Sequence, residues 1–315
     1  MADKNSTAGE KNSPLSTADG KGRGLGTPAW VAICVVVLVA GVLCGHFLLG
    51  GAGSGASAGV ALAGKTTLSE QLLYLGGALR ERGRVDHGDA FLDAEPIERE
   101  RGITVFSGQA DFRWGDSVYY LLDTPGHTDF SAEMERVLPA LDFAVLVVSA
   151  AEGVQGHTET LWRLLGHYGI PAFLFLNKID RPGADAGRTM EQLHRRCSPG
   201  AVLLDGFSGV PDESLAEELA SLDDSLLERY LEGGLEPEDW VPAMRRLVRE
   251  RQLFPCFSGS ALKGEGVREL LDGLELLTET DWEAREDLPF GALAYQVRRG
   301  ASRYVWLKLT SGRLR

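Results

Sequence analysis

The stretch Gly59-Val-Ala-Leu-Ala-Gly64-Lys65-Thr66 decides the fold, because it fits the pattern GxxxxGK[ST]. In that pattern, successive backbone N–H groups wrap a chain of phosphates at the start of a helix, whose dipole favours anions. Lys65 would neutralise the outer phosphate oxygens, and the hydroxyl of Thr66 would bind Mg²⁺. In a sequence with 39 glycines a chance match is the alternative. The segment before the loop, GAGSGAS, also lacks the buried strand that should lead into it.

Downstream of Lys65, predicted helices alternate with short apolar strands. The expected helices cover 65–82, 129–140, 157–168 and 264–278, and the expected strands cover 103–114, 118–122, 143–148, 170–176 and 254–257. This alternation favours βαβ units, and hence an α/β fold with a mostly parallel sheet covered by helices. The acidic, mostly helical residues between these strands predict a surface insertion over about 198–253.

A second motif, Asp123-Thr124-Pro125-Gly126-His127, directly follows the predicted strand 118–122. An aspartate at the carboxyl end of a strand can hold Mg²⁺ through water, and the backbone N–H of Gly126 can bond a γ-phosphate. A plain Pro-Gly turn is the alternative. Further upstream, Arg99-Glu-Arg-Gly-Ile-Thr104 closes a polar stretch. Thr104 could complete the Mg²⁺ shell once a γ-phosphate is present, which would make this stretch a nucleotide-dependent switch. The alternative is a charged loop.

Two later motifs fit recognition of a guanine ring. In Asn177-Lys178-Ile179-Asp180, the carboxylate of Asp180 can accept both N1–H and N2–H₂ of guanine, which adenine cannot supply. Asn177 would reach the other edge of the base, and the stem of Lys178 would lie along the ring. In Ser258-Gly-Ser-Ala261, a backbone N–H could bond guanine O6. Each motif could arise by chance, but their order along the chain favours a nucleotide site.

Taken together, GKTTL, VDHGDAFLDAEPIERERGIT, DTPGH, NKID and SGSAL resemble the translational GTPases. Within that family the sequence is similar to elongation factor G, and most similar to the tetracycline-resistance ribosomal protection proteins. The resemblance implies a P-loop GTPase domain over 64–283 and the start of a β-barrel domain over 288–315. It also implies GTP/GDP and Mg²⁺ as cofactors, the ribosome as partner, and hydrolysis of GTP to GDP and phosphate without a covalent intermediate.

The resemblance also assigns roles to individual residues. His127 would orient the attacking water when the ribosome docks, although a turn histidine that caps the next helix is the alternative. The remaining expected residues bind phosphate (Gly64, Lys65, Thr66, Thr67 and Gly126), guanine (Asn177, Lys178, Asp180, Ser260 and Ala261) or the metal (Thr66, Thr104 and Asp123). Full-length members of this family carry further domains, so we expect no protection from tetracycline by these 315 residues alone.

The first 63 residues predict a different kind of structure. Residues 1–28 are expected to form a disordered tail, and residues 51–63 a flexible linker of small residues. Between them, residues 30–49 carry no formal charge, and about 20 such residues can cross a bilayer as a helix. We therefore expect a transmembrane helix over 29–50, with a signal peptide or a buried core helix as alternatives.

This membrane helix conflicts with the GTPase motifs. The cations that precede it would keep the N-terminus in the cytoplasm and export the remainder, whereas GTP and ribosomes are cytoplasmic. The resemblance also implies a central strand before GKTT, for which this sequence offers no evident donor. One hypothesis is that residues 1–63 belong to a different protein joined at Gly64. The GTPase portion would then be cytoplasmic, or part of a single-pass membrane protein if residues 1–50 are native.

Two other functions remain open at this point: a membrane-anchored, catalytically silent fragment or chimera with impaired nucleotide binding, and an exported anchored protein with a coincidental GKTT. The formal charge of −13 argues against an extended basic surface for nucleic acid, so no DNA partner is expected. The cysteines show no CxxC spacing, which argues against a zinc site or a disulfide framework.

Overall fold

In a computed structural model of the chain, the structure describes residues 32–39, 64–81, 83, 91–92, 108–124, 135–279, 287–299 and 303–312. For residues 32–39, 298 and 299 it describes the backbone alone. The chain divides into two units, Met1–Trp30 and Val31–Arg315, and all of the described residues belong to the second. The predicted tail over 1–28 and the predicted linker over 51–63 lie outside the described residues.

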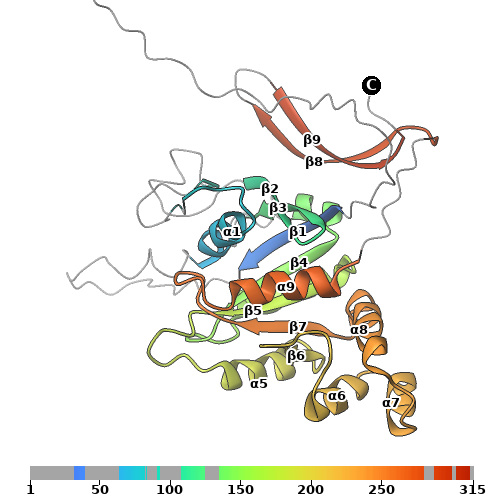
Figure 1. The fold of residues 1–315 in the computed structure, drawn as a ribbon. Helices are drawn as coiled ribbons and strands as arrows, with labels where there is room; N and C mark the ends of the chain where they lie inside the picture. The colour runs from blue at the N-terminus through green and yellow to red at the C-terminus, as the bar shows by residue number, and fades with distance from the viewer. Residues whose placement is uncertain are drawn as a thin grey trace, which may run out of the picture. The chain divides into compact units, whose positions relative to one another are not determined.

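The second unit is built on a seven-stranded sheet with the order β2-β3-β1-β4-β5-β7-β6 (Figure 1). The strands are β1 (Ala32–Val39), β2 (Gly108–Trp114), β3 (Ser117–Asp123), β4 (Phe143–Ser149), β5 (Ala172–Asn177), β6 (Ala201–Leu203) and β7 (Phe254–Ser258). Neighbouring strands run parallel except for the antiparallel pair β2 and β3. The predicted α/β fold with a mostly parallel sheet is therefore confirmed.

Strand β1 corrects the prediction of a membrane helix over residues 29–50. Its backbone pairs with β3 on one side and β4 on the other, so that Val36 lies opposite both Leu122 and Ala144. Among the described residues, no helix has the length and apolar character that a bilayer crossing needs. A run of Val and Ile suits a membrane helix by hydropathy, but it equally suits a strand that is covered on both faces. β1 also supplies the central strand for which the sequence offered no donor.

Helices cover both faces of this sheet. They are α1 (Gly64–Leu75), α4 (Gly156–His167), α5 (Ala186–Arg196), α6 (Glu213–Ala220), α7 (Asp224–Leu231), α8 (Trp240–Arg249) and α9 (Val267–Leu277), with short 3-10 turns η3 (Leu138–Ala140) and η4 (Pro237–Asp239). α1, α8 and α9 pack with one buried cluster, and α4 and α5 with the other. Within β5, Phe173 and Phe175 join the first cluster while Leu174 and Leu176 join the second, as the two-residue period of a strand requires.

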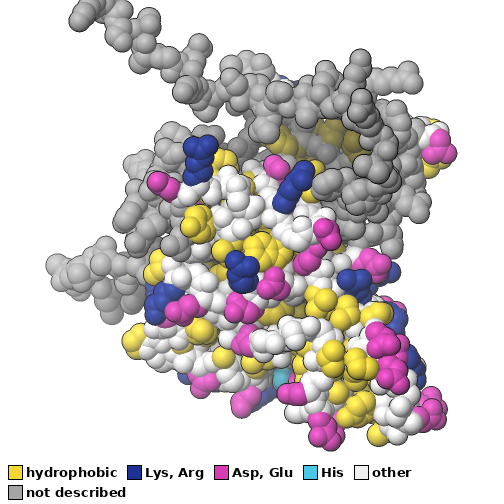
Figure 2. Space-filling model, in the orientation of Figure 1, with side chains coloured by type: hydrophobic (Ala, Val, Ile, Leu, Met, Phe, Trp, Pro, Cys, Tyr) yellow, Lys and Arg dark blue, Asp and Glu magenta, His cyan; other side chains and the backbone are white. Residues whose placement is uncertain are grey.

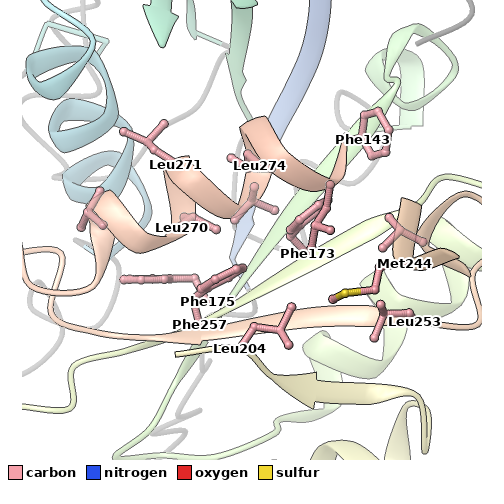
Figure 3. Close-up of a cluster of buried hydrophobic side chains, with 14 of the residues drawn as sticks. Phe143, Phe173, Phe175, Leu204, Met244, Leu253, Phe257, Leu270, Leu271 and Leu274 are labelled. Atoms are coloured by element: carbon pink, nitrogen blue, oxygen red, sulfur yellow. The ribbon is translucent and has the colours of Figure 1, made fainter. Parts of the chain in front are cut away.

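The first cluster holds α9 against the sheet. Figure 3 shows Phe173, Phe175 and Phe257 from the strands facing Leu270 and Leu274 of the helix. The approach is close, because a Cβ added to Gly273 of α9 would lie 2.2 Å from the ring of Phe257. This packing fixes the helix that follows the SGSA loop, and so it also fixes that loop against the ends of β5 and β7.

Helices α6, α7 and α8 lie between β6 and β7 in the sequence, within the expected insertion. Asp223 caps α7 by accepting from the Leu226 backbone N–H, and its carboxylate also binds Arg246 of α8 at 3.0 Å. These bonds lower the pKa of Asp223 to about 2, with the hydrogen bond from Arg246 as the main cause. Acidic side chains gather at the lower right of Figure 2, where Figure 1 places α7.

The last described elements, β8 (Gly291–Arg299) and β9 (Arg303–Ser311), form a separate two-stranded antiparallel sheet. Tyr295 of β8 donates a hydrogen bond to Gln109 of β2 at 3.0 Å, and Lys308 of β9 forms an ion pair with Asp142 at 2.6 Å. The hairpin therefore contacts the GTPase-like part of the chain. That it begins a β-barrel domain stays a prediction.

Candidate functional site

The predicted phosphate-binding residues meet at the carboxyl end of β3. Helix α1 begins at Gly64, so Lys65 and Thr66 lie in its first turn, and both are at most 3% exposed. The ammonium group of Lys65 donates to the backbone oxygen of Thr124 and lies 3.8 Å from the carboxylate of Asp123, the fully buried last residue of β3. The N-terminus of α1, the buried ammonium of Lys65 and the buried carboxylate of Asp123 therefore lie close together.

These residues fit a magnesium ion held together with phosphate. Thr66 offers a hydroxyl and Asp123 a carboxylate, and hard oxygen ligands are those that Mg²⁺ prefers. In the part of the chain that the structure describes, no group of three or more His, Cys, Asp and Glu could hold a metal ion alone. Mg²⁺ usually keeps several waters and binds through one or two carboxylates together with phosphate oxygens, which fits this set of residues.

Asn177 ties the phosphate loop to the two loops predicted to bind guanine. It ends β5, and its side chain is buried. Its Oδ1 accepts from the backbone N–H groups of Lys178 at 2.8 Å and Ala261 at 2.9 Å, and its Nδ2 donates to the Gly64 carbonyl at 3.4 Å. One amide side chain therefore bonds three loops that lie far apart in the sequence.

Close packing holds Lys178 beside the start of α1. Its backbone adopts the left-handed region at φ 67°, and its ammonium lies 3.4 Å from the carboxylate of Glu152. A Cβ added to Gly64 would lie 3.1 Å from Asn177 Nδ2 and 3.8 Å from Lys178 Cε. A side chain at position 64 would press on the amide of Asn177, which favours glycine there.

Asp180 is held in its charged form. A hydrogen bond from Ser260 is the main reason that the pKa of Asp180 lies below its usual value, and nearby Lys263, whose Nζ is 3.7 Å from Asp180 Oδ2, adds to the effect. The backbone N–H of Ile179 also donates to the Gly259 carbonyl at 3.2 Å. The NKID and SGSA loops are thus joined, with the carboxylate of Asp180 between them as an acceptor.

The structure brings together the sequence-predicted residues at the carboxyl ends of β3, β5 and β7 and at the start of α1: Gly64, Lys65, Thr66, Asp123, Asn177, Lys178, Asp180, Ser260 and Ala261. Thr67 lies next to them on α1. Thr104, Gly126 and His127 lie outside the described residues, so their predicted roles stay predictions. In parallel α/β sheets, ligands bind at this carboxyl edge.

Comparisons with known proteins identify the family. A model of the family described as the elongation factor Tu GTP binding domain matches residues 58–280. The chain belongs to this family. It carries the GTP-binding domain of a translational GTPase, as the motifs predicted.

Three curated relatives of this GTP-binding domain are similar along much of the chain. The tetracycline resistance protein TetP of Clostridium perfringens is 38% identical over 229 residues, which cover 67% of this chain and 35% of that protein. The oxytetracycline resistance protein of Streptomyces rimosus is 39% identical over 274 residues, 80% of this chain and 41% of the relative. Elongation factor G 2 of Geobacter metallireducens is 34% identical over 312 residues, 79% of this chain and 45% of the relative.

A solved structure has the same fold as this GTP-binding domain. The crystal structure comes from a protein of Thermus thermophilus, with 27% sequence identity and a TM-score of 0.73. The match covers 90% of this chain and 46% of that one. The chain thus spans less than half the length of each of these relatives.

Sequence reasoning missed three acidic or basic residues around the site of this GTP-binding domain. Glu152 follows β4 at the same edge of the sheet and pairs with Lys178, and Lys263 of the loop after β7 faces Asp180. Glu70 lies one helical turn beyond Thr66 and is 1% exposed. Placement at the carboxyl end of a predicted strand could have indicated Glu152, but no sequence signal pairs Glu70 with its partners.

Proposed function

We propose that this domain binds GTP together with Mg²⁺ and hydrolyses it to GDP and phosphate. The single observation that carries the proposal is the side chain of Asn177, which bonds Gly64 of the phosphate loop and Ala261 of the predicted base loop. These bonds fix the distance between the proposed phosphate site and the proposed guanine site, as binding of one nucleotide requires.

Each group has a distinct part in this proposal. The start of α1 and Lys65 bind the phosphates, and Thr66 with Asp123 holds Mg²⁺, which would neutralise the charge that develops on the phosphate oxygens. Asp180 selects guanine, because an ionised carboxylate accepts from N1–H and N2–H₂ and would repel the acceptor N1 of adenine. His127 would orient a water molecule for attack on the γ-phosphorus, in line with the bond from that phosphorus to the β,γ-bridging oxygen. This bond would break as the new one forms, and GDP would leave.

The partner in this proposal is the ribosome, and the compartment is the cytoplasm, where GTP and ribosomes occur. The support is the similarity to a protein named elongation factor G 2 and to two proteins named for resistance to tetracyclines. The resemblance to translational GTPases implies no arginine finger within the chain itself. We therefore expect slow hydrolysis of GTP until a partner docks.

Nucleotide binding is the first test. The full chain is titrated with fluorescently labelled GTP, with and without Mg²⁺, and with GDP or ATP as competitor. We expect Mg²⁺-dependent binding that GDP displaces and ATP does not. Lys65→Ala should weaken it at least about tenfold, since it removes a charge-assisted contact to phosphate. Binding without selectivity for guanine, or none at all, would overturn the proposal.

Hydrolysis is measured separately as release of phosphate, first with the domain alone and then with added ribosomes. We expect a slow intrinsic rate and a faster one with ribosomes. The matched control is Asp180→Asn, which keeps the volume of the side chain but replaces an acceptor of guanine with a donor. Equal rates for GTP and ATP in the unaltered chain would exclude a guanine-specific hydrolase.

A further inference from the structure

Glu152 is an acidic residue beside the candidate site that none of the nucleotide motifs includes. Its Oε1 lies 3.4 Å from the ammonium of Lys178, a residue of the predicted guanine loop. The buried carboxylate of Glu70 on α1 differs, because it accepts backbone N–H groups from Gly83, Phe91 and Leu92. Glu152 is therefore the acidic residue outside the motifs that bonds to a side chain expected to contact the base.

The turn after β4 holds Glu152 in place. Its backbone N–H donates to the hydroxyl of Ser149, the last residue of β4, at 3.4 Å, and its carbonyl accepts from the side-chain amide of Gln155 at 2.8 Å. Ser149 is paired with Asn177 across β4 and β5, and the backbone N–H of Ala150 donates to the Asn177 carbonyl at 2.8 Å. The turn therefore has a fixed position relative to the loop that begins at Asn177.

Lys178 is held at both ends of its side chain. Its backbone lies in the left-handed region at φ 67° and donates its N–H to Asn177 Oδ1 at 2.8 Å, while Glu152 holds its ammonium. Between these ends the stem passes the start of α1, since a Cβ added to Gly64 would lie 3.8 Å from Lys178 Cε. A lysine side chain loses rotamer freedom when its ammonium is fixed, so the ion pair restricts the stem to this path.

We propose that Glu152 is a positioning residue for the guanine ring. By holding the ammonium of Lys178, it keeps the lysine stem where the ring would lie along it, which lowers the cost of ordering that side chain on binding. The inference rests on the proposed function and extends it to this one contact. Because GDP and GTP share the same base, the effect of Glu152 belongs equally to both nucleotides.

The test measures dissociation constants of the full chain for labelled GDP and for a non-hydrolysable GTP analogue, both with Mg²⁺. Glu152→Gln keeps the shape of the side chain and removes its charge. We expect both affinities to weaken by the same factor, about threefold, because a partly exposed ion pair contributes modestly and its loss returns rotamer freedom to Lys178. A change confined to one nucleotide would overturn the inference.

Glu159→Gln is the matched control for loss of an ion pair. Glu159 lies on α4 and pairs with Arg196, and its side chain is 33% exposed, compared with 32% for Glu152. We expect the two variants to have similar thermal midpoints, and Glu152→Gln alone to release GDP faster. A loss of GDP affinity of the same size in both variants, or in neither, would contradict a positioning role.

A double-mutant cycle asks whether Glu152 acts through Lys178. Lys178→Met removes the ammonium and keeps an apolar stem, so Glu152→Gln should no longer change GDP affinity in that background. Fully additive losses would overturn the inference, as would tighter GDP binding by Glu152→Gln, which would mean that the ion pair holds Lys178 away from the base. Failure of the unaltered chain to bind either nucleotide would instead count against the proposed function, and the inference would fall with it.

Discussion

At the scale of single residues, Asn177 bonds three loops to one another, in addition to its proposed contact with the base. Asn177→Ala would leave the buried N–H of Ala261 without its acceptor, which costs about 1–3 kcal/mol in the free energy of unfolding. Asn177→Asp keeps an acceptor for Ala261 and Lys178, but it loses the donor to Gly64 and sets a buried carboxylate oxygen against that carbonyl. We therefore expect both variants to lose stability in urea unfolding and to release GDP faster. Unchanged stability in both would contradict a structural role for Asn177.

The ionisation of Asp180 depends on its neighbour Ser260. The pKa of Asp180 lies below its usual value, so the carboxylate proposed to accept from guanine is fully present above the usual aspartate range and is lost only as pH falls through the lowered value. Ser260→Ala removes the main cause of that shift. We expect its GDP affinity to begin falling at a higher pH than that of the unaltered chain, with little difference near neutral pH.

The measurement for Ser260→Ala is the dissociation constant of labelled GDP from about pH 7 down to about pH 4, across the usual aspartate range. Circular dichroism at each pH confirms that both chains remain folded. Identical pH profiles would mean that Ser260 does not set the charge of Asp180. The contact itself was not predictable, because Ser260 was expected to serve the base directly rather than through Asp180.

Residues in short motifs could be predicted from sequence, while their supporting partners could not. Asp123 and Asn177 each end an apolar run, and that position alone indicates the carboxyl edge of a sheet. The partners of Glu70 and Lys178 come from segments far away in the sequence, and no local pattern encodes such pairs. The position of the candidate site is thus readable from local sequence, but the bonds that hold it in place depend on tertiary structure.

At the scale of elements, β1 shows that hydropathy alone does not distinguish a membrane helix from a buried strand. A long uncharged run is compatible with a membrane helix and with a strand buried on both faces, since both environments lack water. The Val and Ile content of Ala32–Val39 favours a strand, but length favoured the helix. The strand that should precede GKTT and the apolar run further upstream are the same segment. Residues 40–63 separate this segment from the motif, so the sequence alone did not connect the two.

A proline in β1 tests whether the sheet uses this strand. Val36 pairs with neighbours on both sides, so Val36→Pro would remove a ladder hydrogen bond in the middle of the sheet. We expect a loss of about 3 kcal/mol or more in the free energy of unfolding, measured with urea. Ala18→Pro, within the predicted disordered tail, is the matched control and should leave stability unchanged. An unchanged stability in Val36→Pro would remove β1 from the folded core.

At the scale of the whole molecule, the sheet order argues against two unrelated halves joined at Gly64. β1 precedes the phosphate loop in the sequence, yet it lies between β3 and β4, which both follow that loop. Without it, these two strands would each expose a row of unpaired N–H and C=O groups at the centre of the domain. The hairpin of β8 and β9 adds contacts through Tyr295 and Lys308, but it pairs with none of these strands.

Two deletions distinguish the contribution of β1 from that of the segment before it. Removing residues 1–30 takes away only the first unit, Met1–Trp30, so we expect an unchanged thermal midpoint and unchanged binding of GTP. Removing residues 1–39 also takes away β1, and the exposed edges of β3 and β4 should then cause loss of soluble monomer in size-exclusion chromatography. If the shorter chain stayed monomeric and bound GTP with full affinity, the domain would close its sheet without this strand, and residues 1–39 would be dispensable for the site.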